Sequence, residues 1–188
     1  MKKIHLTVAL FIGFYNHQAW SVHSCSPLAE AAGQAYQVAE KTIAMPMNQT
    51  PSPDLEMTQI DRVGVWQIYQ TEQDLFEDSC GPHPLTAEKQ THSNQSLGLA
   101  YPVLRNKLSQ RFAVVNGRFL IKANDGEKLD LWEKQFKLKR ILTLYDGETA
   151  VFQAEAQQDF AELLHTLQRQ TGLISVWPIL SEQRYRAR

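Results

Sequence analysis

Residues 118–145 read RFLIKANDGEKLDLWEKQFKLKRILTLY, and residues 146–180 continue as DGETAVFQAEAQQDFAELLHTLQRQTGLISVWPIL; together they decide the fold. Runs rich in β-branched and aromatic residues, typical of strands, alternate here with runs whose apolar residues recur every three or four positions, typical of amphipathic helices. We therefore predict the order β-α-β-β-α-β, with strands at 118–123, 140–145, 149–155 and 175–180 and helices at 127–138 and 157–170.

Turn signals at two Gly-containing dipeptides support this order. Asn116-Gly117 predicts a hairpin that joins an additional strand at 111–115 to the strand at 118–123, and Asp146-Gly147 predicts a hairpin between the two middle strands. Right-handed crossovers would bury both helices on one face of an antiparallel sheet, so the opposite face stays open for a partner. We expect Trp132 and Phe160 to be core residues of the helix faces, and Trp177 to belong to the core as well. The predicted fold class is α+β, with a C-terminal ferredoxin-like β-α-β-β-α-β module preceded by a mixed N-terminal extension.

The N-terminal half carries weaker signals. Apolar residues at near-helical spacing predict a helix over 26–45, β-branched and aromatic enrichment predicts a strand over 63–69, and the polar stretch 77–95 is typical of a long exposed loop. We therefore divide the chain into a signal peptide (1–21), an N-terminal extension (22–110), a ferredoxin-like domain (111–180) and an extended C-terminal tail (181–188).

The N-terminal residues have the layout of a secretory signal. Met1-Lys2-Lys3 precedes an apolar run that is too short to span a bilayer, and cleavage is expected after Ser21. The expected location is the periplasm, or outside the cell together with a partner. In such an oxidising compartment an isolated cysteine pair favours a disulfide between Cys25 and Cys80, with a lipid anchor on Cys25 as the alternative.

Charge and motif content exclude several classes of function. Nineteen Lys and Arg residues balance twenty Asp and Glu residues, whereas a nucleic-acid-binding protein would show a basic excess. The histidines lack metal-ligand spacing, so we expect no metal and no cofactor. No nucleophile motif is present, which indicates a protein that is not an enzyme, and no segment after the signal is apolar enough to be a membrane helix.

From about Gly117 to its end, the sequence resembles the propeptide domain of subtilisin-like serine proteases, the inhibitor I9 type. The phrases that carry the resemblance are GRFLIK at 117–122, FKLK at 136–139 and TGLISVWP at 171–178. Since the chain has no protease domain, it also resembles the external chaperones encoded beside some secreted kexin-like proteases. The resemblance implies a separate-chain folding chaperone that inhibits a subtilisin/kexin-like serine protease, in a heterodimer with it.

The resemblance also implies roles for individual residues. In that family the last strand runs into an extended tail that lies in the protease cleft, which here makes Arg188 the P1 residue and places Arg184, Tyr185, Arg186 and Ala187 before it. An Arg at P1 implies an acidic pocket in the partner. Asp146 and Glu148 are the nearest counterparts of the family's acidic residue that caps protease helices. The alternative function is a non-catalytic periplasmic interaction protein of the envelope or of a secretion complex.

Overall fold

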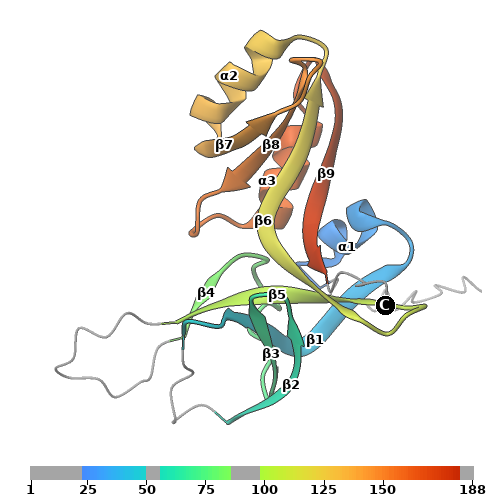
Figure 1. Ribbon diagram of the computed structural model, residues 1–188, viewed down its shortest axis with the longest axis vertical. Coiled ribbons are helices and arrows are strands. Elements are labelled where there is room, and N and C mark those ends of the chain that lie inside the picture. Colours follow the sequence, from blue (N-terminus) through green and yellow to red (C-terminus); the bar gives the residue numbers. More distant parts are fainter. Residues whose placement is uncertain (1–22, 50–55, 86–97, 183–188) are drawn as a thin grey trace, which may run out of the picture.

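The computed structural model describes residues 23–49, 56–85 and 98–182. In this part of the chain nine strands form one antiparallel sheet, in the order β2-β3-β1-β5-β6-β8-β7, with β4 paired to β5 and β9 paired to β6 (Figure 1). The helices are α1 (Ser26–Ala32), α2 (Gly126–Gln135) and α3 (Phe160–Gln168). The strands are β1 (Tyr36–Pro46), β2 (Met57–Val63), β3 (Trp66–Thr71), β4 (His83–Pro84), β5 (Leu99–Asn106), β6 (Phe112–Ala123), β7 (Leu138–Thr143), β8 (Thr149–Ala154) and β9 (Leu173–Glu182).

Strand β6 joins the two halves of the sheet. Its first residues pair with β5, its last residues pair with β8, and β9 runs beside it along nearly its whole length. Figure 1 shows strands β1 to β5 gathered below, and strands β7, β8 and β9 with α2 and α3 above. The long yellow β6 passes from one group to the other, so one strand belongs to both halves.

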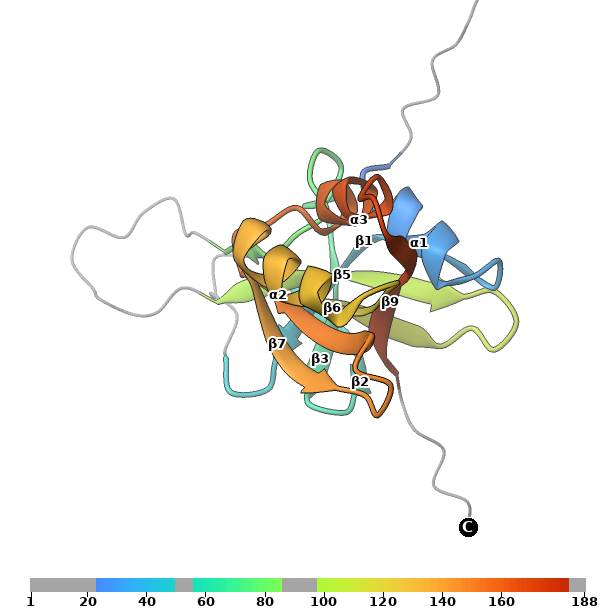
Figure 2. The ribbon, with the colours of Figure 1, turned by 90° about the horizontal axis from the view of Figure 1, so that it is seen from above.

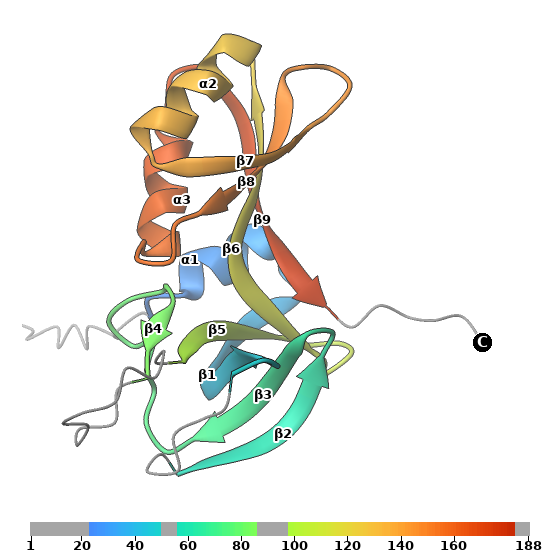
Figure 3. The same ribbon diagram turned by 60° about the vertical axis from the view of Figure 1, so that its left-hand side comes forward.

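Helices α2 and α3 cover one side of the upper strands, and the main hydrophobic core lies on this side of the sheet (Figure 3). The same core continues to α1 and to β1, β3 and β5 in the N-terminal half. Helix α2 contributes Leu129 and Trp132, and α3 contributes Phe160, Leu164 and Leu167, all with at most 2% of their surface exposed. These residues recur at helical spacing, so each helix buries one stripe. The predictions that Trp132 and Phe160 are core residues are therefore confirmed.

Both long helices begin at an aspartate that stabilises the first turn. The Asp125 side chain accepts a hydrogen bond from the backbone N–H of Glu127, and Asp159 accepts from those of Ala161 and Glu162. A carboxylate satisfies backbone donors that have no partner within the helix and also interacts favourably with the helix dipole. These local signals explain why both helices form close to their predicted positions.

A second, smaller cluster lies on the other side of the sheet. It consists of Ala44, Val63, Ile68, Val103 and Val114, with Trp66, Tyr101 and Phe112 partly buried against it. Its members come from β1, β2, β3, β5 and the start of β6. The N-terminal half of the sheet therefore has buried residues on both of its faces, although most of β2 is exposed.

The predicted self-contained ferredoxin-like module is wrong as a description of the fold. The strands after residue 111 are part of a nine-stranded sheet, because β5 pairs with β6 through Val103↔Val114 and Leu104↔Ala113. The N-terminal half is accordingly a continuation of the sheet and not a mixed extension beside it. Strand pairings between distant segments have no local signature, and sequence periodicity therefore could not reveal them.

The predicted hairpin at Asn116-Gly117 is also wrong. Residues on both sides of this dipeptide pair with consecutive residues of the same strand, Val115 with Leu180 and Arg118 with Ile179. Gly117 has a φ of 74° and lies in a bulge that leaves β6 continuous. A Cβ atom at Gly117 would approach Phe160 Cζ to 2.5 Å, so glycine is needed here for close packing as well as for conformation. The Asp146-Gly147 hairpin, by contrast, is confirmed between β7 and β8.

Two predictions for the N-terminal half also fail. Helix α1 ends at Ala32, and the rest of the predicted helix forms β1, which pairs with β3 on one edge and β5 on the other. Gly33, with a φ of 121°, separates the two elements. The strand predicted over 63–69 is divided at Gly64, where the chain turns between β2 and β3. In each case pairing on both strand edges outweighs the local pattern.

Candidate protein-interaction surface

The upper half of the sheet has one covered face and one open face. Helices α2 and α3 lie on one side of β7, β8, β6 and β9, and on the other side the described residues place no helix (Figure 3). Successive residues of a strand point to opposite faces. Since Phe119, Ile121 and Phe152 belong to the buried core, the residues between them point to the open face.

An apolar row crosses this open face, one residue from each strand. Leu120 of β6 pairs with Trp177 of β9 and with Val151 of β8, and Val151 pairs with Leu142 of β7. We call these four residues the apolar row. Trp177 is 48% exposed and Leu142 is 54% exposed, so the prediction that Trp177 belongs to the core is wrong. The exposed Leu144 and Tyr145 extend the apolar surface beyond the end of β7.

Basic residues lie on both sides of the apolar row. On one side Arg118 and Lys139 both pair with Gln153 of β8, and the Arg118 Nε donates a hydrogen bond to Gln153 Oε1 at 3.1 Å. On the other side Lys122 pairs with Thr149, and its Nζ lies 3.8 Å from Asp146 Oδ2. The open face therefore combines an apolar centre with a polar border, which is typical of protein interfaces. The border is cationic at Arg118 and Lys139, whereas Lys122 is paired with Asp146.

Asp146 stabilises the turn between β7 and β8. Its Oδ1 accepts hydrogen bonds from the backbone N–H groups of Glu148 and Thr149, and its Oδ2 accepts from Thr149 Oγ1 at 2.7 Å. The hydrogen bond from the Thr149 hydroxyl is the main cause that lowers the pKa of the Asp146 carboxyl. The structure thus brings Asp146 and Glu148 together at the tip of one hairpin, and their predicted contact with a protease helix stays a prediction.

The end of β9 is anchored to β1. The Tyr36 hydroxyl donates a hydrogen bond to Glu182 Oε1, and Asn116 Nδ2 donates to Ser181 Oγ at 2.9 Å. Burial, followed by the hydrogen bond to Glu182, raises the pKa of the Tyr36 phenol. The predicted cleft-binding residues Arg184, Tyr185, Arg186, Ala187 and Arg188 lie outside the described residues. The anchored strand fixes the point from which they continue.

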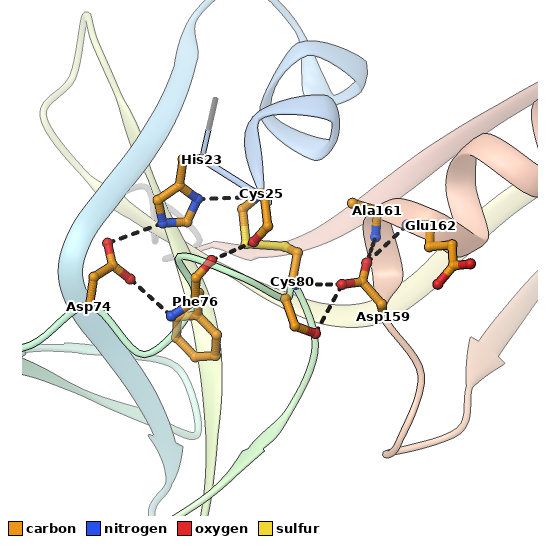
Figure 4. The surroundings of a disulfide bond; sticks show 10 residues. His23, Cys25, Asp74, Phe76, Cys80, Asp159, Ala161 and Glu162 are labelled. Carbon is orange, nitrogen blue, oxygen red and sulfur yellow. Dashed lines mark hydrogen bonds and ion pairs between the residues drawn. A yellow bond between two sulfur atoms is a disulfide. The ribbon is translucent and has the colours of Figure 1, made fainter. Parts of the chain in front are cut away.

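The predicted disulfide between Cys25 and Cys80 is present and completely buried (Figure 4). The Cys80 backbone N–H donates to Asp159 Oδ2 at 2.7 Å, and the Cys80 carbonyl accepts from the backbone N–H of Phe160, also at 2.7 Å. Asp159 therefore stabilises the start of α3 and holds the loop around Cys80 at the same time. Because the Cys25 sulfur is in the disulfide, it is not a lipid attachment point in this structure.

The same loop is tied to the residues before α1. His23 Nε2 lies 3.1 Å from Asp74 Oδ2, and the Ser24 hydroxyl donates a hydrogen bond to the carbonyl of Phe76. Viewed from above, α1 and α3 lie next to each other on one side of the molecule (Figure 2). The disulfide and these contacts thus join the N-terminal segment to the helical layer that backs the open face.

Two further properties concern metals and membranes. Within residues 23–49, 56–85 and 98–182, no group of three or more His, Cys, Asp or Glu side chains could hold a metal ion. None of the helices described there has the length and apolar character needed to cross a bilayer.

Comparison with known proteins gives one family match. No curated protein and no solved structure matches the chain. A family model described as "Open reading frame 2 N-terminal domain" matches residues 20–178, which include nearly all of both halves of the sheet. This is not the inhibitor I9 propeptide family, so the predicted resemblance to that family is wrong. The chain belongs to the family of the Open reading frame 2 N-terminal domain.

Proposed function

We propose that this protein is a non-catalytic folding chaperone that acts as a separate chain on a secreted subtilisin/kexin-like serine protease and then inhibits it. The observation that carries the proposal is the open face with its exposed apolar row. The proposal rests on the open face, on the anchored end of β9 and on the sequence that follows it.

The open face is suited to binding another protein. Its four strands present a continuous apolar row in which Trp177 and Leu142 keep about half of their surface accessible. Aromatic residues at the centre of a contact, surrounded by polar and basic residues, are typical of protein interfaces. A stable complex requires about 800 Å² of buried surface on each partner, which a face of four strands can supply.

Chaperone action follows from such binding by mass action. A protein that binds the native or near-native protease better than the unfolded chain shifts the folding equilibrium toward the folded protease. If it also binds the transition state for folding, it lowers the barrier and accelerates folding. A preformed sheet face favours both effects because little of its own structure must be ordered on binding.

The residues after β9 supply the inhibitory part of the proposal. The sequence Arg184-Tyr185-Arg186-Ala187-Arg188 follows the strand whose end is fixed by Tyr36 and Glu182. An extended segment can bind a protease cleft as an added strand, with main-chain hydrogen bonds for affinity and side chains for specificity. Arginines in this segment would select a protease with acidic pockets, because a guanidinium binds carboxylates in a bidentate manner.

We further propose that the protein acts in the periplasm or is secreted with its partner. A buried disulfide favours an oxidising compartment, and the sequence begins with the features of a secretory signal. The proposed complex is a heterodimer with the protease and requires no cofactor, nucleic acid or membrane. Net charge near zero is consistent with a protein partner.

The alternative is a non-catalytic interaction protein of the envelope or of a secretion complex. It would use the same open face, but it would not need the residues after Glu182. The two functions therefore differ in their dependence on the C-terminal segment, and a truncation separates them.

The test is the refolding of a denatured subtilisin-like protease from the same genome, with recovered protease activity as the readout. The mature protein is compared with a variant that lacks residues 183–188 and with Leu142→Gln on the open face. Leu131→Gln is the matched control, because Leu131 is 59% exposed on α2, on the opposite side of the sheet. Circular dichroism confirms that each variant is folded.

We expect activity with the mature protein and with Leu131→Gln, and a strong reduction with Leu142→Gln. The truncated protein should restore folding less well and should no longer inhibit the folded protease. If recovery is the same with and without the mature protein and no complex forms, the chaperone proposal is wrong and the envelope alternative is favoured. If the truncated protein inhibits the folded protease as well as the mature protein does, the proposed role of the C-terminal segment is wrong.

A further inference from the structure

A hollow of about 300 Å³ lies where the two halves of the protein meet. Its lining comes from β3, β5, β6 and β8, from the loop after Cys80, and from the start of α3. Trp66 and Tyr101 come from the N-terminal half of the sheet, whereas Arg118, Gln153 and Phe160 come from the other half. The hollow therefore exists only when both halves are folded against each other.

The hollow has partly apolar walls. Trp66 and Tyr101 contact each other edge to face, with ring centroids 4.8 Å apart. Both are partly buried against the smaller hydrophobic cluster, which fixes their positions. Phe160 is 1% exposed and closes another part of the lining. Such rigid aromatic walls remove water from a bound group and strengthen electrostatic interactions beside them.

Among the described residues that line the hollow, Arg118 is the only charged one, and a hydrogen bond orients its side chain. Its Nε donates to Gln153 Oε1 at 3.1 Å, and Gln153 Nε2 donates to the Asn116 carbonyl at 2.7 Å. Within the described part of the chain Arg118 forms no ion pair with an acidic residue. A guanidinium that is oriented through Nε still has two terminal nitrogens, which can bind a carboxylate in a bidentate manner.

Arg118 also belongs to the border of the open face. It pairs with Gln153 one row away from the apolar row, while Trp66 and Tyr101 belong to the N-terminal half. A protein that covers the apolar row therefore reaches the mouth of the hollow without any rearrangement of the sheet. The hollow and the open face can be contacted by one continuous surface.

We propose that this hollow receives an acidic side chain, Asp or Glu, from the protein that binds the open face. The inference rests on the proposed function for the identity of that protein, a subtilisin-like serine protease. Charge complementarity selects the acidic group: the cation is oriented, it lacks an acidic partner among the described residues, and aromatic residues line the same hollow. Arg118 is exposed in the free protein, and Arg residues that become buried when a complex forms are common hot spots of protein interfaces.

The experiment measures the dissociation constant between the mature protein and the catalytically inactivated protease from the same genome. Arg118→Gln removes the cation, and Arg118→Lys keeps the charge but loses the bidentate geometry. Lys139→Gln is the matched control, since Lys139 lies in the same row beside Gln153 but outside the hollow. Circular dichroism and thermal unfolding are recorded for each variant.

We expect Arg118→Gln to weaken the complex by roughly 30-fold or more, the effect of a hot-spot residue that the partner buries. Arg118→Lys should fall between it and the wild type, and Lys139→Gln should weaken binding less than about fivefold, as for an exposed charge. Equal effects of Arg118→Gln and Lys139→Gln would overturn the inference and leave the proposed function intact. If the wild-type protein does not bind the protease, both are overturned. If Arg118→Gln does not fold, the affinity of Arg118→Lys is the test. An affinity of Arg118→Lys equal to that of the wild type would overturn the proposed bidentate contact.

Discussion

Removal of the disulfide should lower the free energy of unfolding by about 4 kcal/mol. Cys25 and Cys80 are 55 positions apart in the sequence. For a cross-link of that span, the entropy removed from the unfolded chain is about 14 cal/mol/K, which corresponds to about 4 kcal/mol at room temperature. For a domain of this size the melting temperature would fall by roughly 10–15 °C. The effect is large because the free energy of unfolding of a domain is typically only about 5–15 kcal/mol.

The native contacts around the disulfide should survive its removal. The Cys80 backbone N–H and carbonyl are held by Asp159 and by the Phe160 N–H, and neither hydrogen bond involves a sulfur atom. Loss of the cross-link therefore acts mainly on the unfolded chain. We expect the variant Cys25→Ala/Cys80→Ala to keep the native circular dichroism spectrum at room temperature while it unfolds at a lower urea concentration.

The assay is equilibrium unfolding in urea, followed by tryptophan fluorescence. Three samples are compared: the oxidised protein, the same protein reduced with dithiothreitol, and Cys25→Ala/Cys80→Ala. The reduced wild type is the control for packing, since it has no cross-link but keeps both sulfur atoms. Losses of about 4 kcal/mol in both altered samples would agree with the entropic explanation. A loss below about 1 kcal/mol in the reduced protein would refute it.

Three further predictions concern the helix start, the open face and the hairpin turn. Asp159→Ala should lower the free energy of unfolding by about 2–4 kcal/mol, because it removes both the helix cap and the partly buried acceptor for the Cys80 N–H, and Asp159→Asn should cost less; urea unfolding measures both. Trp177→Gln on the open face should change the free energy of unfolding by less than about 1 kcal/mol, whereas Phe152→Ala on the covered face should lower it by about 3–5 kcal/mol. Thermal unfolding measures both variants, and equal losses would contradict the assignment of faces. The Thr149 hydroxyl is the main cause that lowers the pKa of the Asp146 carboxyl, so this carboxylate stabilises the fold fully above about pH 4 and loses its effect as the pH falls through the folded-state pKa. The difference in free energy of unfolding between the wild type and Asp146→Asn should therefore shrink in acid, as measured by unfolding at a series of pH values.

Local signals in the sequence were sufficient for the elements whose ends are determined locally. Helices α2 and α3 were predicted from apolar spacing, and their starts coincide with the caps Asp125 and Asp159. The Asp146-Gly147 turn was predicted from the dipeptide, and the hydrogen bonds of Asp146 explain why it forms. In these segments neighbouring residues supply the partners that the backbone needs.

The same kind of signal failed at Asn116-Gly117 because its outcome depends on distant residues. A glycine with positive φ fits a hairpin and a bulge equally well. The bulge forms here because β9 pairs with β6 on both sides of the dipeptide and because Phe160 packs against Gly117. Neither β9 nor Phe160 is within forty residues of Gly117 in the sequence, so local pattern could not distinguish the two turns.

The candidate site was predictable only in outline. The order of elements indicated that one sheet face would be open, but the apolar row depends on the register of three strand pairs. A shift of one residue in any strand would send its side chains to the opposite face. Trp177 was therefore assigned to the core, where a tryptophan is statistically common, although it is 48% exposed beside Leu120.

One face of β6 explains why the open face and the hollow adjoin. Val114 points to the smaller hydrophobic cluster, where the N-terminal strands cover it. The β9 partners of Val114, Arg118 and Leu120 lie at every second residue of β9, so the three side chains share one face across the bulge, but beyond it the N-terminal strands no longer cover this face. The boundary falls at the bulge, and Trp66 and Tyr101 form the wall there. A partner that covers the apolar row must therefore meet the N-terminal half at the hollow. The N-terminal half is consequently part of the proposed interface, and its function would be to add the wall that a sheet of four strands lacks.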